Sequence, residues 1–547
     1  MKKIFCLLAA VLLFGSVALL TGCPAKTASK PGPDDTITDP YPNTVNYTTV
    51  KRATADPRYP AGWTNTVNPY TDALKDQLNI TYSINWEDSD YNTHLLADLT
   101  ANTLPDVFNV FDYSTFMQMY NADAIKDLTS DYAQYCPSWF KNFYNTYPDI
   151  FSTVTKDGKL MGLPSTNNGY QQGLLWVRQD WLDALNLQPP KTIDDIETVA
   201  RAFINNNMSG KDTTNGLIVN REDCFDINQQ FGLQGLAATM GAYPEQWMKD
   251  ANGQVYYGSI QPAFKQVLAK VASWVATGII SSDYFDDSFD VIAADATLGN
   301  AGLWFSPWTW PTESFLKHSP STAQVVPYVA PLNADGKAVY ATAEPYDKIL
   351  CVRKDFVNSE LIFKVYNLWY NMTMGLDQAG YDALAPMRAA NTMWHTVAPL
   401  GEFAIRDNRT VPQVGAQVKD FVDNGTMPPA GSEAPRFMYN AQTWKQYLDS
   451  GSQGTPPTAA WPDYMQRYVA SNITDTSDWS PVNPAFFWQT KTMADQWANL
   501  QSMEKTMMRT IMMDPTAIDT FDQFVIDWKA AGGDAITAEV QAAVSGS

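Results

Sequence analysis

The segment 157–203 constrains the fold of this 547-residue chain more than any other part of the sequence. It opens with the dipeptide Asp157-Gly158, which is typical of a tight turn. Two short apolar runs follow, at 160–164 and 173–177, and a polar loop separates them. Short apolar runs bounded by turn residues predict buried strands.

Two helices are predicted directly after the second apolar run. The first covers residues 179–187. The second begins after Pro189-Pro190 at Thr192, where Asp195 stands three residues on, as in a capping box. The apolar face of this second helix is formed by Ile196, Val199, Ala200 and Phe203.

This pattern resembles the family 1 extracellular solute-binding proteins, the maltose-type receptor lipoproteins of sugar ABC importers. The residues that match the family pattern are Asp157, Gly158, Lys159, Gly162, Pro164, Leu175, Trp176, Arg178, Asp180, Trp181, Leu182, Leu185, Leu187, Pro190, Thr192 and Asp194. In that family the strand at 173–177 carries the chain from one lobe to the other. The resemblance implies an α/β, two-lobed periplasmic-binding-protein-like (type II) fold with a hinge, an interlobe cleft and a helix-rich C-terminal part.

The N-terminus has the features of a secretory signal. Lys2 and Lys3 precede an uncharged run over 4–20, which is short for a membrane-spanning helix. Leu-Thr-Gly before Cys23 resembles the bacterial lipobox, which implies a signal peptide over 1–22 and a lipidated Cys23. An ordinary signal peptide with an incidental cysteine is the alternative.

The rest of the chain is too long for one compact core, so at least two domains are expected. Residues 23–42 are rich in Lys, Thr, Asp and Pro and predict a flexible tether. We expect the first lobe over 43–172 plus about 332–380. The second lobe is expected over about 173–331 plus 381–547. Strands that alternate with helices in the first lobe predict a largely parallel sheet, whereas residues 377–480 show no readable pattern.

The net charge and the composition limit the classes of molecule that this protein is expected to bind. A formal net charge of −21 disfavours nucleic acid and argues mildly against a polyanionic ligand. The 18 Trp and 27 Tyr suit stacking on sugar rings, which present apolar C–H faces. The resemblance implies a carbohydrate ligand, ABC permease subunits as partners and a monomer held by lipid on the outer face of the cytoplasmic membrane.

No cofactor or metal is expected. The three cysteines after Cys23 are far apart, and no CxxC or HExxH motif is present. Relatives carry a calcium-binding loop where this chain has residues 205–216. Here the only acidic residue is Asp212, and Lys211 takes one of the ligand positions, so no tightly bound calcium is expected.

The candidate ligand-binding residues fall into two kinds. Aromatic side chains expected to stack on sugar faces are Trp86, Tyr170, Trp304, Trp308 and Tyr346. Polar side chains expected to bind hydroxyl groups are Asp112, Gln172, Arg178 and Glu313.

Different arguments support these candidates. Trp86 and Asp112 follow predicted strands, and ligands of open α/β sheets lie at the carboxyl ends of strands. Trp308 falls on the Pro-Trp segment that maltose-type proteins use to stack on a sugar. Structural roles stay open: Trp86 as a core residue, Arg178 paired with Asp180, and the tryptophans at 304–310 as local packing.

The predicted function is sugar capture without catalysis. Two alternatives remain. A secreted glycoside hydrolase would need two carboxylates at a fixed separation, which the sequence does not exclude. A glycan-binding surface protein would keep the pocket and lack a permease partner. No nucleophile elbow, zinc motif or phosphate loop occurs in the sequence.

Overall fold

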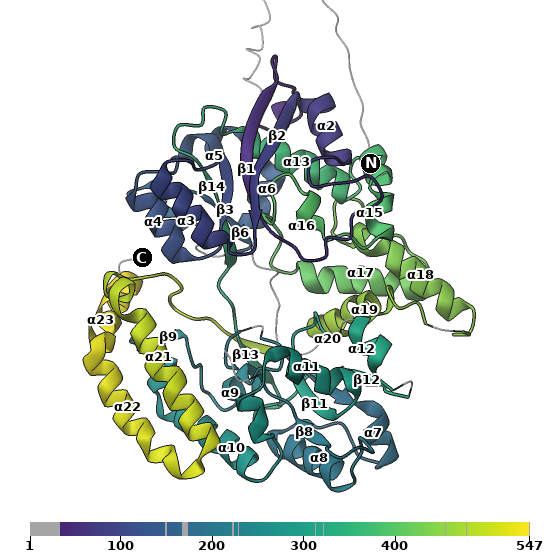
Figure 1. The fold of residues 1–547 in the computed structure, drawn as a ribbon, viewed down its shortest axis with the longest axis vertical. Helices are drawn as coiled ribbons and strands as arrows, with labels where there is room; N and C mark the ends of the chain where they lie inside the picture. Colours follow the sequence, from purple (N-terminus) through teal and green to yellow (C-terminus); the bar gives the residue numbers. More distant parts are fainter. Residues whose placement is uncertain are drawn as a thin grey trace, which may run out of the picture.

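The fold consists of two lobes, each with its own hydrophobic core (Figure 1). They are seen in a computed structural model, which describes residues 33–147, 150–166, 173–220, 224–227, 229–311, 313–320, 322–454, 456–476 and 478–545. In Figure 1 the N-terminal strands lie in the upper lobe, and the C-terminal helices α21–α23 lie in the lower one.

The first lobe is built around a three-stranded sheet with the order β3-β14-β6. A parallel pair, β1 and β2, belongs to the same core. The elements of this lobe are α1 (Pro33–Thr36), β1 (Val45–Arg52), α2 (Pro69–Leu78), β2 (Ile80–Asp88), α3 (Tyr91–Ala101), β3 (Val107–Val110), α4 (Tyr113–Asn121), α5 (Thr129–Tyr135), α6 (Ser138–Tyr144), β4 (Thr155–Lys156), β5 (Lys159–Leu160), β6 (Leu163–Thr166), β14 (Tyr346–Val352), α13 (Leu361–Thr373), α14 (Gln378–Ala383), α15 (Ala385–Ala389) and α16 (Trp394–Val397).

The second lobe is built around a four-stranded sheet with the order β12-β7-β11-β8. The long C-terminal helices pack on the same core. Its elements are β7 (Leu174–Arg178), α7 (Gln179–Ala184), α8 (Ile193–Asn205), β8 (Asn215–Leu217), α9 (Gln234–Thr239), β9 (Trp247–Lys249), β10 (Val255–Tyr257), η1 (Gly258–Ile260), α10 (Pro262–Ala276), η2 (Ser282–Phe285), α11 (Phe289–Leu298), β11 (Ala301–Ser306), α12 (Glu313–His318), β12 (Val325–Tyr328), α21 (Lys491–Met513), η5 (Pro515–Asp519), α22 (Thr520–Trp528), η6 (Lys529–Gly533) and α23 (Asp534–Ser545).

Among the remaining elements, α17–α19 lie at the side of the two lobes, where α17 and α18 form a small apolar cluster of their own, and β13 lies within the lower lobe (Figure 1). They are β13 (Ala338–Ala341), α17 (Thr410–Asn424), η3 (Ala434–Phe437), α18 (Met438–Asp449), α19 (Trp461–Asp463), η4 (Tyr464–Ala470), α20 (Ser471–Thr476) and β15 (Trp479–Val482). β13 and β15 pair with each other in parallel, so two segments 141 residues apart in the chain run side by side.

Local sequence signals explain several of these elements. The capping box expected at the start of α8 is present: Asp195 N donates to Thr192 Oγ1 at 3.1 Å, and Thr192 N donates to Asp195 Oδ2 at 3.0 Å. Asn68 caps α2 in the same way, before a proline in the first turn. The apolar run 348–352 becomes the central strand β14 of the first sheet.

The three-stranded sheet of the first lobe is antiparallel, although the sequence predicted a largely parallel sheet there. β14 is antiparallel to both of its neighbours, β3 and β6. It enters the first lobe from the second lobe, so it runs against strands that belong to the N-terminal part of the chain. The second sheet is mixed, because β7 is antiparallel to β11 and β12 whereas β11 is parallel to β8.

The first core also continues further along the chain than the boundary near residue 380 expected from the sequence. Leu384, Val397 and Ile405 are buried in the first core, and the second core resumes at Val411. The short helices α14–α16 show no long periodic pattern, which is why their membership could not be read from the sequence.

Within the described part of the chain, no helix combines the length and the apolar character needed to cross a membrane.

Candidate functional site

Two cavities lie where residues of both cores meet. The first, here called the arginine cavity, has a volume of about 260 Å³. Leu384 of the first core and Val411 of the second line it. The second, here called the carboxylate cavity, has a volume of about 490 Å³. Tyr346 of the first core and Trp247 of the second line it, and the two cavities share no lining residue.

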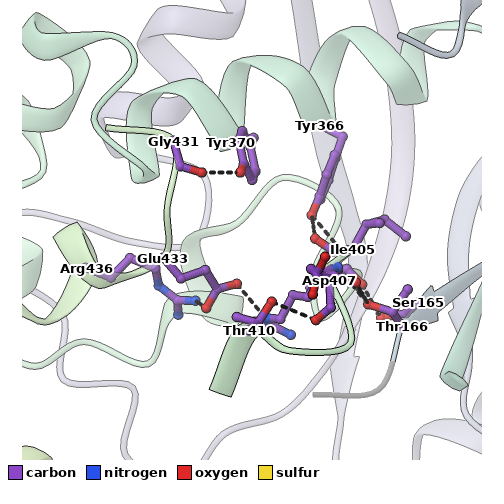
Figure 2. Close-up of polar contacts among 12 residues, drawn as sticks. Ser165, Thr166, Tyr366, Tyr370, Ile405, Asp407, Thr410, Gly431, Glu433 and Arg436 are labelled. Carbon is purple, nitrogen blue, oxygen red and sulfur yellow. Dashed lines mark hydrogen bonds and ion pairs between the residues drawn. The ribbon is translucent and has the colours of Figure 1, made fainter. Parts of the chain in front are cut away.

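The arginine cavity contains a buried ion-pair network centred on Glu433. Arg406 Nε lies 2.5 Å from Glu433 Oε1, and Arg436 Nη1 lies 3.0 Å from Glu433 Oε2. Each of the three side chains is only 12% exposed. Figure 2 shows Glu433 beside Arg436, close to the loop that ends at Thr410. Although burial opposes ionisation, the two guanidinium groups hold the pKa of Glu433 below its ordinary value.

The loop that carries Arg406 is fixed by the first lobe (Figure 2). Tyr366 on α13 accepts a hydrogen bond from Ile405 N at 2.7 Å. At the end of β6, Thr166 Oγ1 accepts from Arg406 N at 2.7 Å, and Ser165 Oγ donates to the carbonyl of Ala404 at 2.9 Å. These bonds place the Arg406 side chain at the edge of the cavity without using its guanidinium group.

Arg467 lies between two aromatic rings in the same cavity. Its guanidinium carbon is 4.2 Å from the ring centre of Trp308 and 4.1 Å from that of Phe437. Burial lowers the pKa of Arg467 to about 10, so the group is still charged at neutral pH. Its Nε is buried and has no hydrogen-bond partner among the residues that the structure describes.

The carboxylate cavity has the opposite character. Four acidic residues and several aromatic rings line it: Asp226, Glu245, Glu344, Asp347, Phe225, Trp247, Tyr346, Phe486, Phe487, Trp488 and Trp497. Burial raises the pKa of Glu344, and the charges of Asp226 and Asp347 raise it further. Aromatic faces beside carboxylates are the groups that stack on sugar rings and bind sugar hydroxyls.

A further buried carboxyl group lies behind this cavity. Tyr257 donates to Glu504 Oε2 at 2.9 Å, and the Tyr257 ring contacts Trp247 and Trp497, which line the cavity. Burial raises the pKa of Glu504 to about 7.

The structure brings two of the predicted aromatic residues to cavities, but to different ones. Trp308, 3% exposed, lines the arginine cavity directly after β11. Tyr346, at the start of β14, lines the carboxylate cavity. Their roles in ligand binding remain predictions.

Four other predicted residues line neither cavity. Trp304 is fully buried in the second core, with its ring 4.8 Å from that of Trp310. Trp86 donates from Nε1 to Asp98 at 2.7 Å and stacks on His94. A sugar contact from either ring would require a change in these neighbours.

Arg178 and Asp112 have structural partners. Arg178 is 3% exposed and makes a bidentate ion pair with Asp180, at 2.8 and 2.6 Å, which is the alternative role that the sequence raised. Asp112 caps α4 by accepting from the backbone and hydroxyl groups of Thr115 and from Asn92. The predicted contacts by Tyr170 and Gln172 lie outside the described residues, and so does the side chain of Glu313, which begins α12.

Sequence reasoning missed Arg388, Arg406, Glu433, Arg436 and Arg467. All five lie between residues 377 and 480, where no periodic pattern guides interpretation. The available signal was chemical: this segment of an acidic chain contains several arginines, and arginine is the usual basic residue of buried ion pairs.

The loop at 205–216 does not fit a calcium site. Lys211 Nζ donates to the carbonyl of Leu298 and to Asn300 Oδ1, both at 2.7 Å. The hydroxyl groups of Ser209 and Thr214 both donate hydrogen bonds to Asn207 Oδ1. An ammonium group among the available oxygens opposes a second cation, and calcium needs several charged oxygens.

The two lobes, with cavities between them, define a two-lobed ligand-binding protein. The family model described as "Bacterial extracellular solute-binding protein" matches residues 66–352, more than half of the chain. The chain therefore belongs to this family of extracellular solute-binding proteins.

Curated relatives match over part of their length. The "Polygalacturonan/rhamnogalacturonan-binding protein YtcQ" of Bacillus subtilis (strain 168) is 29% identical over 214 residues, which cover 38% of this chain and 40% of that protein. The "Lipoprotein LipO" of the same organism is 26% identical over 156 residues, 28% of this chain and 30% of that protein. The matches thus span less than half of either relative.

Solved structures match over nearly the whole chain. An "HMO binding ABC-transporter associated Solute Binding Protein" from Bifidobacterium longum infantis superposes with a TM-score of 0.60 at 16% identity, over 92% of this chain and 98% of that one. The S. pneumoniae protein FusA in complex with kestose gives a TM-score of 0.61 at 15% identity, over 92% and 99%. At these identities the likeness concerns the fold.

Proposed function

We propose that this protein captures a carbohydrate, an oligosaccharide, between its two lobes and delivers it to a membrane ABC permease. The observation that carries the proposal is that both cavities are lined by residues of the two cores. A ligand in such a position contacts both lobes at once, so its binding energy favours their closed arrangement.

The cavity walls support a carbohydrate rather than an apolar ligand. Rings such as Trp308 and Trp488 stand beside side chains that accept or donate hydrogen bonds, such as Asn440 and Asp347. Sugars need this combination of flat apolar faces and hydroxyl partners. The names of the curated relative YtcQ and of two solved relatives, which refer to saccharides, support the same class of ligand.

The protein works outside the cytoplasmic membrane. Residues 1–22 are a signal peptide. A lipid on Cys23 holds the mature chain at the outer face of the cytoplasmic membrane, through the tether that follows Cys23. The mature protein is a monomer. It makes or breaks no bond, so the acidic residues of the carboxylate cavity bind hydroxyl groups instead of serving as acid and base.

The proposal is tested by thermal unfolding of residues 24–547, which include every described residue, with a panel of neutral and acidic oligosaccharides. A ligand that binds only the folded state raises the unfolding midpoint. We expect a raised midpoint with at least one oligosaccharide, recovered intact by chromatography. The matching monosaccharides serve as controls and should shift the midpoint less, because they contact fewer residues.

Two results would contradict the proposal. Shorter products in the chromatogram would identify a hydrolase. A midpoint unchanged by every saccharide would remove the carbohydrate as the ligand.

A further inference from the structure

The arginine cavity carries a positive charge in a protein of formal net charge −21. Its lining includes four guanidinium groups and two carboxylates, so the cavity has an excess of two positive charges. The arginines are Arg388, Arg406, Arg436 and Arg467, and the acids are Glu433 and Asp463. Surplus cations in a partly enclosed site are stabilised when an anion enters it.

The arginines are not equivalent. Arg406 and Arg436 both pair with Glu433. Arg388 donates from Nη1 to the carbonyl of Tyr381 at 2.8 Å. Arg467, by contrast, has no described residue that accepts a hydrogen bond from its Nε.

Two aromatic rings lie within 4.2 Å of the guanidinium carbon of Arg467 and restrict its movement. Trp308 follows β11 of the second lobe, and Phe437 is the last residue of η3, directly before α18. The edge of the guanidinium group, where its N–H donors lie, is the part that binds an anion. That edge presents N–H donors in a fork that matches a carboxylate or a sulfate ester in a bidentate pair.

The rest of the lining fits a saccharide around this charge. The Trp394 ring and the polar side chains of Asn391, Thr392 and Asn440 line the same cavity. Hydroxyl groups next to an acidic group are the feature that distinguishes an acidic sugar from a simple anion.

We propose that Arg467, held between Trp308 and Phe437 beside the Glu433 ion-pair network, binds the anionic group of an acidic oligosaccharide. The anionic group is a carboxylate, as in a uronic acid, or a sulfate ester. This inference rests on the proposed function and specifies its ligand class. It also differs from the expectation that the negative net charge of the chain disfavours a polyanionic ligand, because the charge of the cavity is positive.

The first arm of the test compares matched ligands on the unaltered protein. Oligogalacturonate, oligomannuronate and sulfated galactose oligomers are titrated by calorimetry, each uronate beside its carboxyl-reduced counterpart and the sulfated oligomer beside its desulfated one. We expect one acidic oligomer to bind about tenfold or more tightly than its neutral counterpart, since hydrogen bonds between charged groups are the stronger ones. The preferred acid distinguishes carboxylate from sulfate ester.

The second arm assigns the preference to Arg467. Arg467→Gln should remove the difference between the acidic ligand and its neutral counterpart, and Arg467→Lys should restore part of it as a point charge. Lys445→Gln is the matched control, because it also removes one positive charge, from a residue on α18 that lines neither cavity. This control should keep the preference.

The outcomes separate the inference from the proposed function. Equal binding of acidic and neutral oligomers, or a preference that persists in a folded Arg467→Gln variant, overturns the inference and leaves carbohydrate binding intact. Failure of every oligosaccharide to bind overturns both. If Arg467→Gln does not fold, the comparison of ligands on the unaltered protein still decides whether an acidic group is recognised.

Discussion

The arginine cavity and the carboxylate cavity lie between the same two lobes, yet they differ in the sign of their charge and in its response to pH. Arginine side chains stay protonated throughout the physiological range. The carboxyl groups in and behind the other cavity, Glu344 and Glu504, have raised pKa values, about 7 for Glu504. One end of the interlobe region therefore keeps a fixed charge, and the other becomes more negative as pH rises towards 8.

The two cavities are also electrostatically connected. Burial by itself lowers the pKa of Arg406, but the carboxylates of Glu433 and Asp347 outweigh this effect and raise it above the ordinary value. Asp347 lines the carboxylate cavity, whereas Arg406 lines the arginine cavity. A ligand that spans both would thus meet a gradient of charge along its length, which favours one orientation over the reverse.

The largest expected effect comes from removing the acid between two arginines. Glu433→Gln leaves Arg406 and Arg436 buried without their counter-ion, and breaking such a buried pair typically lowers the free energy of unfolding by about 3 kcal/mol or more. Urea unfolding measures this loss. Sulfate should restore more stability to this variant than to the unaltered protein, because an anion can replace the missing carboxylate.

Glu402→Gln is the control for that variant. It removes a carboxylate from a similar pair with Arg52, but Arg52 is 49% exposed, so the loss should be about 1 kcal/mol or less. A loss from Glu433→Gln no larger than this would show that solvent already screens the arginine cavity.

An intermediate effect is expected at Glu504 and depends on pH. Because its pKa is raised in the folded state, the folded protein holds a proton that the unfolded chain releases, and stability falls as pH rises from about 4.5 to 7. Glu504→Gln mimics the protonated form and keeps an acceptor for Tyr257. It should be nearly neutral at pH 4.5 and stabilising by about 3 kcal/mol at pH 8, because the pKa of Glu504 rises from 4.5 to about 7 on folding.

Glu539→Gln is a control for which the expected change in stability at pH 8 is opposite to that of Glu504→Gln. Glu539 accepts from Thr492 N at 3.0 Å and from Thr492 Oγ1 at 2.7 Å. Although burial opposes ionisation, the Thr490 hydroxyl and these two bonds hold the pKa of Glu539 below its ordinary value. Its contribution to stability is present above the unfolded pKa and lost as pH falls, so this variant should destabilise the protein at pH 8. A Glu504→Gln variant that is also destabilised at pH 8 would contradict the raised pKa.

The smallest expected effect concerns the ring that supports Arg467. Trp308→Ala should weaken binding of the preferred oligosaccharide by about 1 kcal/mol or somewhat more, roughly the contribution of one aromatic contact. Calorimetry on a variant with unchanged circular dichroism measures it. Trp488→Ala changes a ring of the other cavity, so equal losses from both variants would indicate a ligand that contacts both cavities. Unchanged affinity in Trp308→Ala would exclude Trp308 from the site.

These cavities mark the limit of what the sequence could predict. The two-lobed α/β fold follows from the resemblance around residues 157–203, and the pattern of apolar residues located elements such as β7 and α8. The resemblance also singled out Trp308, which does line a cavity. Arg406, Glu433 and Arg467 escaped because short helices and loops far apart in the chain bring them together, and such contacts leave no periodic trace in the sequence.

Reasoning from residue type alone was less informative. Trp304 and Arg178 have the chemistry of sugar-binding residues, but Trp304 is packed in the second core and Arg178 pairs with Asp180. A tryptophan on a buried strand can pack against many neighbouring side chains, and the sequence does not reveal which of them it contacts. Trp308 is also buried, at 3% exposed, and differs from these residues in that it lines a cavity, which only the fold determines.

The insertion of β14 into the centre of the first sheet has a mechanical consequence. The described residues pass from one core to the other between β6 and β7, between β12 and β14, and after Ile405. Bodies joined by one tether can drift apart or twist freely, whereas several tethers permit little except swinging about an axis through them. Since β14 is anchored between two strands, tension applied to the second lobe is transmitted directly to the middle of the first.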